Sequence, residues 1–284
     1  MSEAAYELAG RLAAAGSPSP GPEARTIVAH VLGVEPSRLI LIDEVTAEQQ
    51  AAIGRLGDRR AAGEPVQHLT GEAWFRHERL EVGPGVFIPR PETEVMVGWA
   101  LKHLARLESR RVVELCAGSG AISAALGGEL GGLEQYAVEL DPTAFRYLTR
   151  NLEGRGVELV LGDMAMALPE LDGTVDMVIV NPPYVPERLR PFLPNDVVDH
   201  DPELALFSGA DGLDAMQTVV RAANRLLRRG GLLVTEHDDS HQPAVLELFG
   251  QAGYCDVVAH TDMTGRPRFV TGVKGPDLMT RIEP

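Results

Sequence analysis

The spacing of apolar residues predicts helices in the first part of the chain. Apolar residues recur three to four positions apart from residue 4 to about residue 62, and a proline-rich segment at 17–22 separates the first helical stripe from the second. Thr46-Ala47-Glu48-Gln49 has the pattern of a capping box, which predicts a third helix running toward Arg60. No constellation of catalytic residue types occurs here, so we interpret this region as a small helical bundle that recognises or positions a partner.

A different pattern follows between residues 65 and 90. Apolar and polar residues alternate in 66–70 and again in 79–82, and Gly83-Pro84-Gly85 then provides a turn. We therefore predict a strand pair or hairpin that links two domains. Pro91 suits the first position of the helix that comes next.

From residue 111 onward, apolar runs typical of buried strands alternate with helical patterns, which predicts a parallel sheet with helices on both faces. The predicted strands are 111–116, 135–139, 157–161, 175–180 and 231–236, and the predicted helices are 119–127, 142–153, 212–228 and 241–251. Two further strands, 255–260 and 268–273, are joined only by a turn, so one strand should run antiparallel. That reversal favours a methyltransferase-type sheet over an all-parallel dinucleotide-binding sheet.

These patterns divide the 284 residues into a helical substrate-recognition domain at 1–72, a hairpin linker at 73–90 and an α/β domain at 91–284. The formal net charge of −15 argues against a nucleic-acid binder, because phosphate recognition requires a basic surface. An acidic chain instead fits a small-molecule site or docking to a basic protein partner.

Cysteine use and apolar content bear on the compartment. The two cysteines, Cys116 and Cys255, lack paired spacing, which fits a reducing cytoplasm and excludes a disulfide framework or a cysteine-based zinc site. The N-terminal residues lack the pattern of a secretory signal, and no apolar run approaches the ~18 residues of a membrane span. We therefore expect a cytoplasmic protein without a bound metal and without membrane contact.

The tetrapeptide Asn181-Pro182-Pro183-Tyr184 follows the apolar run 175–180. It thus lies at the carboxyl end of a predicted buried strand, where open α/β sheets bind ligands. Asparagine offers an acceptor and a donor, the prolines stiffen the turn without adding N–H groups, and tyrosine supplies a flat face. These features suit a planar carboxamide or an exocyclic amine. We assign catalysis to Asn181, Pro182 and Tyr184, and substrate binding to all four residues.

A glycine turn joins the predicted strand at 111–116 to the helix that follows it. Gly118 and Gly120 allow close approach of the backbone, and the helix N-terminus offers N–H groups to an anionic group. Ser123 stands where the nicotinamide fingerprint requires glycine or alanine. Glu139 and Asp163 end the next two predicted strands, where they can accept hydrogen bonds from ribose hydroxyls and from the amine of adenine.

Acceptors at adjacent strand ends beside a glycine turn describe an adenosine joined to an amino acid, and S-adenosylmethionine matches that description. The residues assigned to this cofactor are Glu114, Ala117, Gly118, Ser119, Gly120, Ala121, Glu139, Leu140, Asp163, Met164 and Asn181. Two roles stay open. Glu114 either binds the amino group of the ligand or orders the turn, and Asp163 either binds adenine or caps a following helix.

With these residues in place, the chain closely resembles the release-factor glutamine methyltransferase family from about residue 23 to residue 273. The segments that carry the resemblance are 64–71, 87–94, 117–121, 181–184, 202–206, 209–213 and Glu236-His237. The most specific segment is Ile88-Pro89-Arg90-Pro91-Glu92-Thr93-Glu94. The Asn-Pro-Pro-Tyr motif is less specific, because it also resembles motifs of enzymes that methylate the amino groups of adenine or guanine.

The resemblance implies a seven-stranded Rossmann-like methyltransferase domain, joined by a β-hairpin linker to an N-terminal bundle of five helices. It implies methyl transfer from S-adenosylmethionine to the side-chain amide of the glutamine in the Gly-Gly-Gln motif of class-1 peptide chain release factors, with S-adenosylhomocysteine as the product. We expect a monomer that binds no nucleic acid directly.

Several points stay open at this stage. Ala117 stands where the family usually has threonine or serine, and 238–242 is less typical of the family. Arg90 and Glu92 either contact cofactor or substrate, or form a structural interdomain salt bridge. The competing functions are a ribosomal-protein glutamine methyltransferase, a methyltransferase for nucleic-acid bases, which the acidity disfavours, and a binding protein without activity. His200, His237 and His241 receive no catalytic role.

Overall fold

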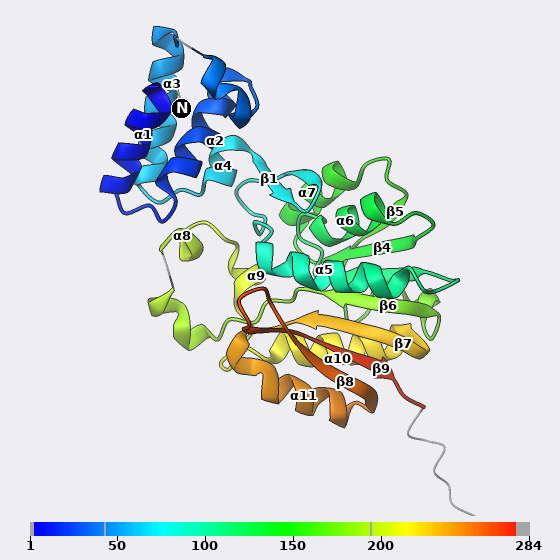
Figure 1. Cartoon of the computed structure of the whole chain (residues 1–284). Helices are drawn as coiled ribbons and strands as arrows, with labels where there is room; N and C mark the ends of the chain where they lie inside the picture. Colours follow the sequence, from blue (N-terminus) through cyan, green and yellow to red (C-terminus); the bar gives the residue numbers. More distant parts are fainter. Residues whose placement is uncertain (1–2, 43, 194, 277–284) are drawn as a thin grey trace, which may run out of the picture. The chain divides into compact units, whose positions relative to one another are not determined.

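The computed structural model describes residues 3–42, 44–193 and 195–276, and these residues form two compact units (Figure 1). The first unit contains the described residues up to Glu72, together with Val82–Pro84 and residues 195–200. The second unit contains Ala73–Glu81, Gly85–Leu193 and the described residues from Asp201 onward.

The first unit is helical, as predicted. Its main helices are α1 (Glu3–Ala14), α2 (Pro20–Leu32) and α3 (Ala47–Ala61), with shorter turns at η1 (Pro36–Leu41), α4 (Val66–Thr70) and α8 (Asn195–Val198). Leu8, Ile27 and Ile53 come from the three main helices and share one apolar core. The predicted capping box is present, because Thr46 Oγ1 accepts a hydrogen bond from the Gln49 backbone and the Gln49 side chain accepts one from the Thr46 backbone.

One local prediction in this region is wrong. Residues 66–70 form the short helix α4 and not a strand, and the hairpin consists of β1 (Glu72–Phe75) and β2 (Glu78–Glu81). Val66 and Leu69 both join the apolar core of the first unit, because a spacing of three places them on one face of a helix. Five residues are too few to separate that spacing from strand alternation. Phe75 and Leu80 of the hairpin lie in the core of the second unit.

The second unit is built on a sheet that has seven strands within the described residues, in the order β5-β4-β3-β6-β7-β9-β8. The strands are β3 (Arg111–Leu115), β4 (Glu134–Glu139), β5 (Val157–Leu161), β6 (Val175–Val180), β7 (Leu227–Glu236), β8 (Tyr254–Thr261) and β9 (Pro267–Lys274). β9 pairs antiparallel with both β7 and β8, and the other pairings are parallel. The predicted single reversal is therefore confirmed.

Helices cover both faces of this sheet (Figure 1). They are α5 (Pro91–Leu104), α6 (Ala121–Glu129), α7 (Pro142–Leu152), α10 (Asp214–Leu226) and α11 (Gln242–Gln251), with short turns at η2 (Pro169–Leu171), η3 (Glu187–Phe192), α9 (Glu203–Leu206) and η4 (Asp239–His241). Successive residues of β6 point to opposite faces: Ile179 packs in the core formed with α5, α6 and α7, and Val178 packs in the core formed with α10 and α11. With both faces covered, the edge where the parallel strands end is left for ligands.

Candidate active site

The register of the sheet brings the predicted site residues to one edge. Leu115 of β3 pairs with Val138 of β4 on one side and with Val180 of β6 on the other, and Val180 in turn pairs with Thr235 of β7. The carboxyl ends of these strands therefore lie in a row. The residues that follow or end the strands in this row are Cys116, Glu139, Gly162, Asn181 and Glu236.

The glycine turn between β3 and α6 is held by Glu139. Gly118 and Gly120 adopt the left-handed backbone conformation, with φ angles of 56° and 81°. The Gly118 N–H donates to Glu139 Oε2 at 2.7 Å, and the Asp141 N–H donates to Glu139 Oε1 at 2.7 Å. Burial raises the pKa of Glu139. Each carboxylate oxygen has a further lone pair, so Glu139 can hold the turn and still accept from a ligand hydroxyl.

Glu114 is engaged inside the protein. Its side chain is 2% exposed, and Oε2 accepts hydrogen bonds from the Ser123 backbone at 2.9 Å and from the Ser123 hydroxyl. Burial raises the pKa of Glu114 to about 8. The carboxyl group of this β3 residue therefore contacts the first turn of α6, just beyond the glycine turn. The same contact gives a local reason for serine at position 123.

Asp163 follows β5 and is exposed. Its Oδ1 accepts a hydrogen bond from the Ala165 backbone at 2.9 Å. Because residues 164–166 form a turn, the side chain stabilises a turn and does not cap a helix. Leu140, beyond the end of β4, is 51% exposed, and Met164 Sδ lies 3.7 Å from Cys116 Sγ. Asp163 and Leu140 are thus exposed to solvent at the same edge of the sheet as the glycine turn.

Asn181 belongs to a buried hydrogen-bond network that the sequence analysis did not predict. Asn181 Nδ2 donates to Thr93 Oγ1 at 3.2 Å, and Thr93 Oγ1 donates to Glu236 Oε2 at 2.6 Å. The Tyr184 hydroxyl lies 3.4 Å from Glu236 Oε1. Thr93 and Glu236 are 4% and 1% exposed. Both lie in segments that carry the family resemblance, but 143 positions separate them, and no local pattern indicates that they meet.

Burial raises the pKa of Glu236 to about 7. Hydrogen bonds from Thr93 and Tyr184 and the positive charge of Arg268 act against this rise, and the negative charge of Glu92 adds to it. Burial also raises the pKa of the Tyr184 hydroxyl, which is therefore protonated and available as a donor at neutral pH.

The segment 202–213 forms hydrogen bonds with Val185, the residue that follows the tetrapeptide. The Val185 N–H donates to the Leu206 carbonyl at 2.8 Å, and the Ser208 N–H donates to the Val185 carbonyl at 3.0 Å. Gly212 has a φ of 84°, and a Cβ there would lie 2.4 Å from the Tyr184 carbonyl oxygen. Only glycine permits this approach without a shift of the backbone.

Arg90 forms an ion pair inside the second unit. Its guanidinium donates to Asp201 Oδ2 at 2.5 Å and stacks over the Phe87 ring, 5.0 Å from its centroid. Both partners belong to the same unit as Arg90, so this ion pair does not join the two units. Glu92 is exposed.

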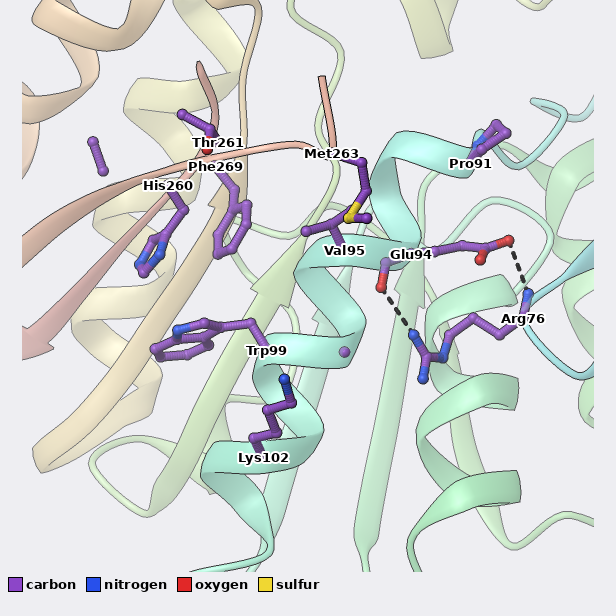
Figure 2. Close-up of a pocket in the computed structure, with 12 residues that line it drawn as sticks. Arg76, Pro91, Glu94, Val95, Trp99, Lys102, His260, Thr261, Met263 and Phe269 are labelled. Carbon is purple, nitrogen blue, oxygen red and sulfur yellow. Dashed lines mark hydrogen bonds between the residues drawn. The ribbon is translucent and has the colours of Figure 1, made fainter. Parts of the chain in front are cut away.

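A separate cavity lies between α5 and the β8–β9 hairpin (Figure 2). Its volume is about 810 Å³. Glu94, Trp99, Lys102, His260 and Met263 are among the residues that line it. None of the predicted site residues lines this cavity. α5 therefore contributes to two places: Thr93 joins the Asn181 network, and Glu94 and Trp99 line the cavity.

The described residues contain neither a cluster of metal ligands nor a membrane-spanning helix. Among the described residues, no group of three or more His, Cys, Asp or Glu side chains is arranged to hold a metal ion. No helix in the described ranges combines the length and the apolar character needed to cross a bilayer.

Comparisons with known proteins cover nearly the whole chain. Residues 3–71 match the family model described as PrmC N-terminal domain, and residues 84–191 match the Methyltransferase small domain. A release factor glutamine methyltransferase of Streptomyces coelicolor is 45% identical over 267 residues, which is 93% of this chain and 94% of the relative. The corresponding protein of Mycolicibacterium smegmatis is 44% identical over 93% of this chain and 94% of its own length.

A third relative has a different activity. The 4-amino-L-phenylalanine/4-methylamino-L-phenylalanine methyltransferase of Streptomyces pristinaespiralis is 36% identical, over 89% of this chain and 88% of the relative. The relatives at 44–45% identity, together with the matched N-terminal domain, show the family. The chain belongs to the release factor glutamine methyltransferase family.

Proposed function

We propose that the protein transfers a methyl group from S-adenosylmethionine to the side-chain amide nitrogen of the Gly-Gly-Gln glutamine of a class-1 peptide chain release factor. One observation carries the chemistry. Asn181 Nδ2 donates to Thr93, and Asn181 Oδ1, beyond the carboxyl end of β6, accepts no hydrogen bond from the residues that the structure describes. An amide nitrogen that must be methylated carries two hydrogens, and each requires an acceptor.

The residues at the sheet edge fit the proposed cofactor. A Cβ at Gly118 would meet no atom within 4 Å, so open space lies directly beside the turn. The residues that would hold the cofactor are Glu114, Ala117, Gly118, Ser119, Gly120, Ala121, Glu139, Leu140, Asp163, Met164 and Asn181. Within this set, Glu139 would accept from the ribose hydroxyls and Asp163 from the adenine amine, whereas Glu114 would act through the Ser123 contact. Ala117 is 5% exposed and packs in the apolar core, so it would contribute its backbone.

When bound, S-adenosylmethionine supplies an electrophilic methyl group on a positively charged sulfur. The chain must then make a poor nucleophile react, because the lone pair of a carboxamide nitrogen is delocalised into the carbonyl group. In our proposal Asn181 Oδ1 and the Pro182 carbonyl accept the two hydrogens of the substrate amide. These contacts hold the nitrogen in one orientation and stabilise the positive charge that develops on it.

The remaining residues of the tetrapeptide would shape the binding site. Pro183 has no N–H, so it cannot donate into the turn and compete with the substrate. The Tyr184 hydroxyl is anchored on Glu236, which leaves its ring to pack against the planar amide and exclude water. The amide proton would leave after methyl transfer, when the nitrogen has become acidic, so no strong base is required.

We further propose that the helical region 1–72 recognises the release factor, and that 73–90 links it to the methyltransferase domain at 91–284. The match of residues 3–71 to the PrmC N-terminal domain supports a separate role for this region. The net charge of −15 suits docking to a basic protein surface and disfavours direct binding of nucleic acid. In this proposal the protein acts as a cytoplasmic monomer.

A labelling assay tests the function. The protein is incubated with S-adenosylmethionine labelled in the methyl group and, in parallel reactions, with a class-1 release factor, ribosomal proteins, total RNA and 4-amino-L-phenylalanine. We expect label on the release factor, and none on a release factor whose Gly-Gly-Gln glutamine is replaced by alanine. Label on ribosomal proteins, RNA or the amino acid, without label on the release factor, would contradict the proposal.

A further inference from the structure

We propose that Thr93 and Glu236 are positioning residues, whose hydrogen bonds fix the Asn181 amide so that its oxygen and not its nitrogen is presented to the substrate. This inference rests on the proposed function and adds to it. Thr93 contacts Asn181 directly, and Glu236 contacts it through the Thr93 hydroxyl.

The protons available in the network determine the direction of its hydrogen bonds. A threonine hydroxyl has one hydrogen and two lone pairs. Thr93 Oγ1 lies 2.6 Å from Glu236 Oε2 and 3.2 Å from Asn181 Nδ2, so its hydrogen is used in the shorter contact with the carboxylate. Thr93 can then only accept from Asn181, which requires the NH₂ end of the Asn181 amide. The opposite orientation would place two acceptor oxygens against each other.

Regular secondary structure holds Thr93 and Glu236 in place. Thr93 lies in the first turn of α5, and its backbone N–H donates to the Arg90 carbonyl at 3.2 Å. Glu236 is the last residue of β7 and pairs with Phe269 of β9. Both side chains are almost completely buried, so water does not compete for their hydrogen bonds. Asn181 is therefore held by partners that belong to a helix and to a strand.

The charge state of Glu236 also affects the direction of these hydrogen bonds. Arg268, Thr93 and Tyr184 favour the carboxylate, whereas burial and Glu92 favour the protonated acid. When the acid is protonated, its own hydrogen can be donated to Thr93, and the Thr93 hydrogen becomes available for the Asn181 oxygen. Asn181 can then turn its NH₂ end toward the substrate. Since the pKa of Glu236 is raised to about 7, the productive orientation is lost as the pH falls through that value.

A set of threonine variants tests the inference. Thr93→Val keeps the shape of the side chain and removes the hydroxyl, and Thr93→Ser keeps the hydroxyl. Thr271→Val is the matched control, because Thr271 is also a buried threonine of the second unit, 3% exposed, but lies on β9 beside His260. We measure kcat and KM for the release factor, the Kd for S-adenosylmethionine by calorimetry, and the thermal melting curve.

We expect kcat of Thr93→Val to fall roughly 10- to 100-fold, with KM and Kd changed by less than about 3-fold, because a misoriented group reduces the rate and not the affinity. Thr93→Ser and Thr271→Val should retain kcat within about 3-fold. A normal kcat for Thr93→Val would overturn the inference, and so would an equal fall in Thr93→Ser. A wild-type protein that does not label the release factor would overturn the proposed function, and this inference with it.

A second variant decides the question if Thr93→Val does not fold. Glu236→Gln places an amide here, which gains no proton in this pH range but can present either its oxygen or its NH₂ group to Thr93. The wild-type kcat should decline as the pH falls through about 7, and Glu236→Gln should lack that decline whatever its absolute rate. The same acidic decline in both proteins would overturn the inference.

Discussion

Replacement of Glu114 by glutamine should change how the stability of the second unit depends on pH. Glu114 is 2% exposed, and burial raises its pKa from 4.5 to about 8. Because the pKa is higher in the folded state than in the unfolded state, the folded chain is favoured while the native carboxyl group is protonated. This contribution to the free energy of unfolding is fully present below about pH 4.5 and is lost as the pH rises through about 8.

The size of the effect follows from the shift. A shift from 4.5 to about 8 corresponds to roughly 5 kcal/mol, and relaxation of the site and entry of water reduce the realised loss to about 2–4 kcal/mol. Glutamine keeps an oxygen that accepts from Ser123, but its NH₂ group replaces a carboxyl oxygen in a buried site, which costs about 1–3 kcal/mol. Glu114→Gln should therefore be less stable than the wild type at pH 5 and more stable at pH 9.

Tryptophan fluorescence provides the assay, because both tryptophans, Trp74 and Trp99, belong to the second unit and report its unfolding separately. Urea denaturation is followed at intervals from pH 5 to pH 9. Glu158→Gln, at an exposed position on β5, is the matched control and should leave the pH profile unchanged. Parallel stability curves for Glu114→Gln and the wild type across this range would refute the reasoning.

Two further substitutions test how the tetrapeptide and the segment before α5 are supported. Gly212→Ala places a Cβ 2.4 Å from the Tyr184 carbonyl at a φ of 84°, so we expect a loss of about 2 kcal/mol or more in urea denaturation and a lower kcat; unchanged values would show that the backbone there adapts freely. Arg90→Ala removes the ion pair with the buried Asp201, so we expect the second unit to lose about 1–3 kcal/mol, with a smaller loss for Arg90→Lys. Equal stability of Arg90→Ala and the wild type would contradict a structural role of this ion pair.

The parts of the fold that the sequence predicted well are those with long, regular patterns. The run 175–180 is fully buried on both faces, as its apolar residues on either side of Asp176 indicated, and Asn181 follows it at the sheet edge. The short turn between the last two strands required an antiparallel pair, and β8 and β9 form one. Residues 66–70 were mispredicted because strand alternation and a single helical turn share apolar positions over so short a segment.

The hydrogen-bond network of the site was beyond sequence reasoning for a different reason. Asn181 and Thr93 are 88 positions apart, and only the packing of α5 against the sheet brings them together. No local spacing rule links the first turn of a helix to the end of a strand so far away. Glu114 was ambiguous from sequence for a similar reason, because its partner Ser123 faces it only once the glycine turn has reversed the chain.

The central claim is that Asn181 accepts a hydrogen of the substrate amide, and single-turnover methylation by Asn181→Ala tests it most directly. The rate is measured at saturating release factor and S-adenosylmethionine, alongside the Kd for the cofactor. Asn224→Ala is the matched control, because Asn224 lies in α10 and its side chain donates to the Ala252 carbonyl. We predict that Asn181→Ala loses roughly 100- to 1,000-fold in rate while the Kd changes far less, because ten other residues are assigned to the cofactor. A rate close to that of Asn224→Ala and the wild type would contradict the account.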